Sequence, residues 1–310
     1  MNTDVEILIE RRRGRRKLLF WRVAGVVLLS GLAFSLARPW LGGHGSGGDV
    51  IGSDHVARLH VEGIITTDMD LEQRLEDAGT DDNIKALLVR INSPGGTAAG
   101  GEAIYDAIGR VGKKKPVVAM MDEVATSAAY MAAIAADRVY ARKSSVTGSI
   151  GVIFQSADFS GLLDRVGIKP EVIRSGSLKA RPNPLEPMNE KTRQATEAVV
   201  QDLHTMFVDM VVERRGLNET AVRALADGRI FTGTQAAKKG LVDALGGEVE
   251  ALDWLKGQPG VGADLPVRDL KRPRDPLGWT RFFRESLQKA LFSESLRLDG
   301  LVSLWHPDGR

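Results

Sequence analysis

The chain has 310 residues, of which 43% are hydrophobic and 26% charged, a composition typical of globular proteins that argues against disorder. It contains no cysteine, which excludes disulfide bonds, thiolate catalysis and cysteine-ligated zinc. The formal net charge is +2, but residues 1–40 hold eight Arg and Lys residues against three acidic ones, so the remainder is slightly acidic. This distribution gives no support for nucleic-acid binding.

The N-terminal segment has the pattern of a membrane anchor. Residues 18–37 form an apolar run interrupted only by Arg22, and twenty helical residues rising about 1.5 Å each match a hydrocarbon core of about 30 Å. Trp21 and Trp40 flank the run as interfacial residues do. The basic cluster before it predicts that residues 1–17 are cytoplasmic and that the rest of the chain lies on the other side. A cleaved signal peptide is the alternative, with Ser35-Leu36-Ala37 as the cleavage site.

Short apolar, β-rich runs then alternate with helical patterns. Residues 38–54 are glycine-rich and predict a flexible tether, and residues 55–257 predict one α/β domain with a mainly parallel sheet. The expected strands are residues 56–61, 84–92, 116–122, 137–141, 151–154 and 170–174. The expected helices are residues 68–78, 98–111, an alanine-rich helix from Ser127, 159–166 and 189–215, with shorter helices to about residue 255.

Residues 258–310 predict a basic linker and a helical tail. Apolar residues recur there at helical spacing, with basic residues between them: Trp279, Phe282, Phe283, Leu287 and Leu291. A helix docked on the domain or on another subunit and a helix lying on a membrane surface both fit this pattern.

Three loops at expected strand ends carry residues suited to chemistry. In residues 92–97 (NSPGGT), Pro94 fixes one φ angle, while Gly95 and Gly96 allow backbone amides to turn toward one point. Such amides suit a developing oxyanion, although a plain strand-to-helix turn has the same residues. Phosphate binding is disfavoured because no GxGxxG or GxxxxGK[ST] pattern is present.

The other two loops contain serines. Ser127 lies among small residues at the expected start of a helix, which suits either an activated nucleophile or an ordinary N-cap. Residues 147–151 (TGSIG) form a polar turn in which Ser149 could supply a helper hydroxyl.

A serine nucleophile needs a base, and the histidines are poor candidates. The chain has five histidines, namely His44, His55, His60, His204 and His306. None of them has surroundings that suggest a catalytic triad. A lysine serves as base when burial and nearby positive charge lower its pKa from about 10.4. Lys179 follows an expected strand through a Ser-Gly turn, and Lys143 and Lys169 are its competitors. From the residues alone the choice stays open.

Together these segments resemble the signal peptide peptidase A family over about residues 56–247. The resemblance rests on the following segments: INSPGG (residues 91–96), TSAAY (126–130), AADRVYA (135–141), TGSIGV (147–152), IRSGSLKA (173–180) and DGRIFTGTQAAKKGLVDALGG (227–247). It implies a Clp/crotonase-like fold of repeated β-β-α units. It also implies a Ser-Lys dyad of Ser127 and Lys179, an oxyanion loop at Gly95 and Gly96, and Ser149 as a helper. Ala128 and Ala129 replace the two glycines that follow the serine in many members, which affects substrate preference more than catalysis.

The resemblance further implies a membrane-anchored serine endopeptidase that acts through an acyl-enzyme on cleaved signal peptides and other unfolded apolar peptides. It would lie in the bacterial inner membrane as a single-pass homo-oligomer, with the catalytic domain periplasmic or extracytoplasmic and the dyad possible across subunits. The sequence indicates no metal and no organic cofactor. Two alternatives share the fold, namely a crotonase-like enzyme acting on acyl-CoA and a catalytically inactive membrane scaffold.

Overall fold

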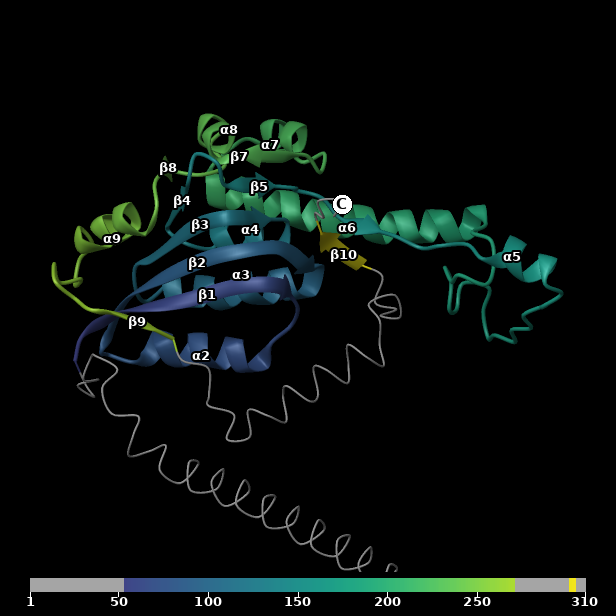
Figure 1. Cartoon of the computed structure of the whole chain (residues 1–310), viewed down its shortest axis with the longest axis horizontal. Coiled ribbons are helices and arrows are strands. Elements are labelled where there is room, and N and C mark those ends of the chain that lie inside the picture. Colours follow the sequence, from purple (N-terminus) through teal and green to yellow (C-terminus); the bar gives the residue numbers. More distant parts are fainter. Residues whose placement is uncertain (1–52, 271–300, 305–310) are drawn as a thin grey trace, which may run out of the picture. The chain divides into compact units, whose positions relative to one another are not determined.

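The computed structural model describes residues 53–270 and 301–304 (Figure 1). The expected membrane anchor, most of the tether and the expected tail helix lie outside these residues. Within the described ranges, no helix combines the length and the apolar composition needed to span a bilayer.

A parallel sheet forms the centre of the described chain (Figure 1). Each strand of the following series pairs in parallel with the next: β9 (Val267–Asp269), β1 (His55–Ile65), β2 (Ile84–Thr97), β3 (Val117–Thr126), β4 (Arg138–Ala141) and β8 (Ala244–Leu245). This arrangement confirms the α/β class and the mainly parallel sheet.

The two faces of the sheet follow from the alternation of side chains along β2. Leu87, Val89 and Ile91 belong to a core shared with four helices: α2 (Met69–Thr80), α3 (Ala98–Gly112), α4 (Ala128–Ile134) and α6 (Glu190–Arg215). Ala86 and Leu88 point to the opposite face, where α9 (Glu248–Lys256) covers a smaller core. Both faces are buried along this strand, as a parallel sheet requires.

The helix boundaries follow from capping residues. The Asn189 side chain accepts a hydrogen bond from the Thr192 amide at the start of α6, and Gly216 ends that helix at φ +62°. Asp68 and Thr97 cap α2 and α3 in the same way as Asn189. These helices therefore begin and end within two residues of the expected positions.

Long strands make up the first half of the domain, and the β-β-α units that the resemblance implied stay a prediction. Single strands and helices alternate from β1 to α4. After a register shift between Ile91 and Ser93, β2 runs on through the glycine loop, and the second half of β3 leaves β4 to pair with β5 (Val146–Gly148). One long strand thus pairs at two places.

Several smaller elements differ from expectation. Residues 170–174, expected as a strand, have no regular structure, because Val172 and Ile173 are exposed and no strand pairs with them. The strands β5 and β7 (Ile230–Thr232) were not expected, and β10 (Leu301–Leu304) lies in the region expected to be helical. The remaining elements are β6 (Ile153–Phe154), α5 (Ser160–Arg165), α7 (Glu219–Leu225) and α8 (Gly233–Lys238).

Arg214 connects α6 to the C-terminal end of α4. Its guanidinium donates to the carbonyls of Ile134, Ala135 and Ala136 at 2.8, 2.6 and 2.9 Å. Carbonyls at a helix end have no intrahelical partner, so this side chain both satisfies them and complements the helix dipole.

Replacing Arg214 with methionine keeps the aliphatic length and removes all three hydrogen bonds. We expect the free energy of unfolding of the full-length protein to fall by about 2–4 kcal/mol, because hydrogen bonds from a charged donor are lost at buried acceptor residues. Urea denaturation measures the change. Arg193→Met, at an exposed position of the same helix, is the matched control. Equal midpoints for the two variants would contradict the role of Arg214.

Candidate active site

Ser127 occupies the sharp turn between β3 and α4. Its backbone has φ +56° and ψ −122°, a conformation that costs energy for any residue except glycine. Its amide donates to the carbonyl of Gly148 at 2.9 Å, and although Ser127 occupies the N-cap position of α4, its side chain makes no capping hydrogen bond. The side chain is fully buried, and its Oγ has no hydrogen-bond partner in the part of the chain that the structure describes.

Strained backbone conformations occur at, or directly beside, the candidate residues predicted from the sequence. Three non-glycine residues among those described have positive φ, namely Ser127 at +56°, Ser149 at +51° and Ala180 at +57°. Ser149 is the expected helper, and Ala180 directly follows Lys179. Strained backbone of this kind persists only where the surroundings hold it, and it is concentrated at functional sites.

The glycine loop is organised by Ser93. The buried Ser93 hydroxyl donates to the Gly63 carbonyl at 2.6 Å and accepts from the Gly95 amide at 3.1 Å. Gly95 has φ +111°, and a Cβ on Gly96 would lie 1.8 Å from the Ile65 carbonyl oxygen, so both positions require glycine. The Gly95 amide thus contacts a serine hydroxyl, while Gly96 lies opposite Ile65 of β1 and Ser303 of β10 in the sheet.

A second candidate donor to an oxyanion is the backbone amide of Ala128, next to the serine. Ala128 is the first residue of α4, where a backbone amide has no intrahelical acceptor. Gly101 explains why this helix approaches α3 so closely, because a Cβ there would lie 2.9 Å from the Ala128 Cβ and 2.6 Å from the Met131 Sδ.

Short hydrogen bonds connect the three expected loops. Thr126 Oγ1 donates to the Pro94 carbonyl at 2.9 Å, which joins the end of β3 to the glycine loop. Thr147 Oγ1 donates to the Ala125 carbonyl at 2.7 Å, which joins β5 to β3. The structure therefore brings residues 92–97, 125–130 and 147–151 together. The sequence analysis missed Ser93 and Thr126, although both lie inside the quoted motifs.

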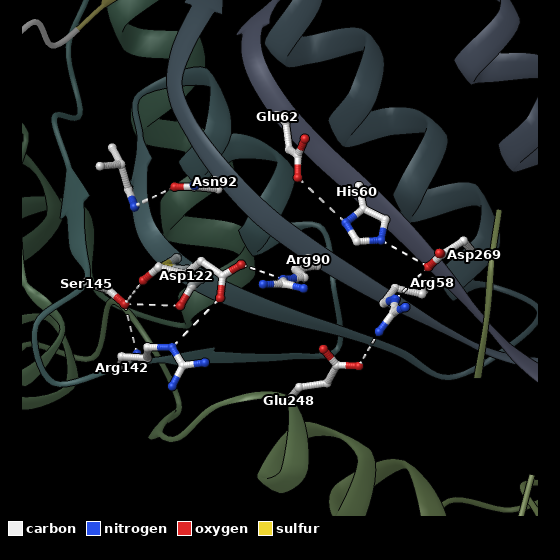
Figure 2. Close-up of polar contacts among 12 residues, drawn as sticks. Arg58, His60, Glu62, Arg90, Asn92, Asp122, Arg142, Ser145, Glu248 and Asp269 are labelled. Atoms are coloured by element: carbon white, nitrogen blue, oxygen red, sulfur yellow. Dashed lines mark hydrogen bonds and ion pairs between the residues drawn. The ribbon is translucent and has the colours of Figure 1, made fainter. Parts of the chain in front are cut away.

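The histidines that could serve as base are occupied elsewhere. Figure 2 shows His60 between two carboxylates on one face of the sheet, with Nε2 3.0 Å from Asp269 Oδ1 and Nδ1 3.8 Å from Glu62 Oε1. The hydrogen bond from Arg58 holds the pKa of Asp269 below its ordinary value. His204 contacts the Ala226 carbonyl at 2.8 Å. None of these described histidines contacts Ser127.

The rest of this polar face is also paired internally. Arg58 contacts Glu248 at 2.6 Å, and Arg90 contacts Asp122 at 2.5 Å (Figure 2). Arg142 lies 3.8 Å from the second oxygen of Asp122.

Lys179 lies apart from the serine within one chain. It belongs to residues 155–189, here called the arm, which contain α5 and extend from the body of the domain (Figure 1). No residue of the arm is buried, and Lys179 itself is exposed. Since Ser127 Oγ has no hydrogen-bond partner among the described residues, the structure does not join the expected dyad in a single chain.

The arm exposes many apolar side chains. Ile173 is 103% exposed, and the other large apolar residues involved are Phe159, Leu162, Val166, Ile168, Val172, Leu178 and Leu185. A concentration of exposed apolar residues in one segment marks an interaction surface.

A strained, buried serine between a glycine-rich loop and a helix N-terminus is an arrangement typical of nucleophilic serine sites in α/β folds. The model of peptidase family S49 matches residues 110–262. A Synechocystis protein provisionally named as the protease slr0021 is 35% identical, with 62% of this chain and 69% of that protein aligned. An Enterococcus faecium protein provisionally named as signal peptide peptidase SppA is 33% identical over 59% of this chain. The aligned part is 54% of that relative's length.

The chain belongs to peptidase family S49, the signal peptide peptidase A family. Among solved structures, a mutant of the membrane-bound stomatin-specific protease 1510-N is similar, with a TM-score of 0.45 and 16% identity. That alignment covers 72% of this chain and all of the other.

Gly96→Ala tests the close approach of β1 and β2. We expect a loss of at least about 3 kcal/mol in the free energy of unfolding, because the new methyl group can fit only if the strand backbone moves. Gly109→Ala is the control, since a Cβ there meets nothing within 4 Å and a helical alanine is favoured by about 1 kcal/mol over glycine. Urea denaturation of the full-length variants measures both effects. Similar stability of the two variants would contradict the requirement for glycine at position 96.

Proposed function

We propose that this chain is a serine endopeptidase in which Ser127 is the nucleophile and Lys179 the general base. The observation that carries the proposal is the strained, buried Ser127 with an unpaired hydroxyl beside the glycine loop, in a chain of peptidase family S49. A turn of this kind presents an Oγ without a competing hydrogen bond, as a nucleophile requires.

The amides of Gly96 and Ala128 supply the oxyanion hole. Gly96 lies in the loop ordered by Ser93, and Ala128 lies at the N-terminus of α4, where the helix dipole favours negative charge. The family resemblance implies Gly95 as a donor as well, and its φ of +111° sets the turn of this loop.

The base comes from the arm of a second copy. Lys179 and the arm's apolar residues are exposed in one chain, while Ser127 lacks a partner among the described residues. Docking of a neighbouring arm beside the Ser127 turn would cover apolar surface, and a local opening over the buried Oγ would let the lysine complete the site. Burial of an amine favours its neutral form, which is the form that accepts a proton. Ser149 then orients the incoming lysine.

The reaction proceeds in two stages. The neutral Lys179 amine takes the Ser127 proton as Oγ attacks the peptide carbonyl, and the tetrahedral oxyanion is held by the two amides. Collapse of this intermediate breaks the C–N bond, and the protonated lysine donates to the leaving amine. The lysine next deprotonates a water molecule, which hydrolyses the acyl-enzyme ester and releases Ser127.

Peptides bind as extended strands along the end of β2. In this structure β10 pairs antiparallel with β2 at Gly95, Gly96 and Thr97, and it pairs with β6 on its other side. A peptide strand that displaces β10 gains the same kind of backbone hydrogen bonds, independent of its sequence. This mode of binding favours unfolded segments, including cleaved signal peptides. With residues 18–37 as a bacterial inner-membrane anchor and the domain periplasmic or extracytoplasmic, such apolar peptides would be close to the site.

Ser127→Ala and Lys179→Met test the dyad in the full-length protein. We expect each variant to cleave an unfolded peptide at least about a thousandfold more slowly, because members of a nucleophile–base pair act as a unit. Lys169→Met, at an exposed position of the same arm, is the matched control and should keep its activity. Undiminished cleavage by Ser127→Ala or by Lys179→Met would refute the dyad.

Mixing the two inactive variants before assembly tests whether the dyad crosses subunits. One chain then supplies serine and its neighbour supplies lysine, so about one site in four should be competent in a random ring. No recovery of cleavage would place both residues in one chain.

Ile173→Glu tests the arm as the assembly surface. We expect the charge to weaken self-association and to lower activity, because a desolvated glutamate at an interface costs several kcal/mol. Analytical ultracentrifugation in detergent measures the distribution of oligomers. Met69→Glu, at an 85% exposed apolar residue of α2, is the control. The same oligomer for both variants would contradict this role of the arm.

A further inference from the structure

An ionic cluster surrounds the loop that carries Lys179. The Glu186 carboxylate accepts hydrogen bonds from Arg174 through both of its oxygens, with Nη1 3.1 Å from Oε2, and from Nη2 of Arg181. The two arginines precede and follow Lys179 in sequence. One carboxylate therefore closes the loop from residue 174 to residue 181.

This cluster takes the place of a hydrophobic core. Residues 155–190 contain no buried residue, yet the side chains of Arg174, Glu186 and Arg181 are only 13%, 19% and 19% exposed. A bidentate pair between a guanidinium and a carboxylate fixes direction as well as distance. The polar cluster therefore restrains a loop that has no buried apolar side chain.

The loop also contains strained backbone that needs support. Ala180 has φ +57°, and tight turns surround it, with the Lys179 amide 3.1 Å from the Gly176 carbonyl and the Arg181 amide 3.2 Å from the Leu178 carbonyl. A non-glycine residue holds this conformation only where flanking contacts restrain it. Restraint at Arg174 and Arg181 acts on both sides of the strained position.

Among the described residues, the cluster leaves two buried nitrogen atoms without hydrogen bonds, which a purely stabilising role does not explain. The Nε atoms of Arg174 and Arg181 are buried and have no hydrogen-bond partner within the described part of the chain. The hydrogen bond from Arg174 lowers the pKa of Glu186, so the carboxylate stays charged at neutral pH and the contribution of the cluster is lost only as the pH falls through the acid range. Departures from full hydrogen bonding are typical of sites retained for function.

We propose that Glu186 is a positioning residue for Lys179. By holding Arg174 and Arg181 together it fixes the direction in which the loop presents the amine to Ser127. This inference rests on the proposed Ser-Lys peptidase function, and Glu186 itself touches neither the substrate nor the reacting atoms.

Glu186→Gln tests the proposal, because glutamine keeps the shape of the side chain and removes the charge that binds two guanidiniums. We expect kcat for peptide cleavage to fall at least tenfold with KM within about twofold, since lysine acts in the chemical step and not in binding. Glu186→Asp, which keeps the charge, should recover part of the loss. Glu171→Gln, the same change at an exposed position of the arm, is the matched control. Thermal unfolding confirms that each variant is folded.

Mixed assemblies separate positioning from general destabilisation. Glu186→Gln is placed either in the Ser127→Ala chain, which supplies the lysine, or in the Lys179→Met chain, which supplies the serine. We expect the recovered activity to fall only in the first case. An equal fall in both cases would show a structural role and overturn the proposal.

The outcomes also separate this inference from the proposed function. Full activity of Lys179→Met would refute both. Loss of activity in Lys179→Met, together with equal kcat values for Glu186→Gln and Glu171→Gln, would refute the positioning role alone. If Glu186→Gln does not fold, Arg181→Gln removes one of the two ion pairs of the cluster. An unchanged kcat in that variant would equally overturn the proposal.

Discussion

The site depends on one strained peptide at the end of β3. Ser127 is held at φ +56° by the hydrogen bond from its amide to Gly148, and α4 begins at the next residue. Gly148 ends β5, so the strain at the serine is sustained by the pairing of a neighbouring strand with the second half of β3. Folding of the sheet therefore stabilises a backbone conformation that the isolated segment would not adopt.

The same sheet explains why the glycine loop lies beside the serine. In parallel strands the carboxyl ends meet at one edge, and β2 and β3 are neighbours, with Ser93 opposite Ala125. The Ser93 hydroxyl then fixes the Gly95 amide, and the contact of Thr126 with Pro94 keeps the two loops in register. Rigidity of this kind is what an oxyanion site needs, because its donors must be in place before charge develops.

Much of the domain could be predicted from the sequence, because the local signals and the tertiary structure agree. The helix from residue 190 to 215 has an asparagine cap and a glycine end, and the buried strand β2 is apolar on both faces. The motif at residues 92–97 was recognisable from the sequence, but the separate contacts that its residues make were not. Only the structure shows that the Ser93 hydroxyl contacts the Gly95 amide and that Gly96 lies against the Ile65 carbonyl.

The mistaken strand at residues 170–174 has a physical cause that bears on function. Sequence patterns detect apolar, β-branched runs and assign them to a buried strand, since apolar residues are normally buried inside the same chain. Val172 and Ile173 fit that pattern, yet they are exposed in a segment without a core of its own. A surface meant to be covered by another subunit carries the same composition as an interior. In the proposed assembly, the prediction failed at the surface that a second copy would cover, and there the contacts of Glu186 with Arg174 and Arg181 restrain the lysine loop within one chain.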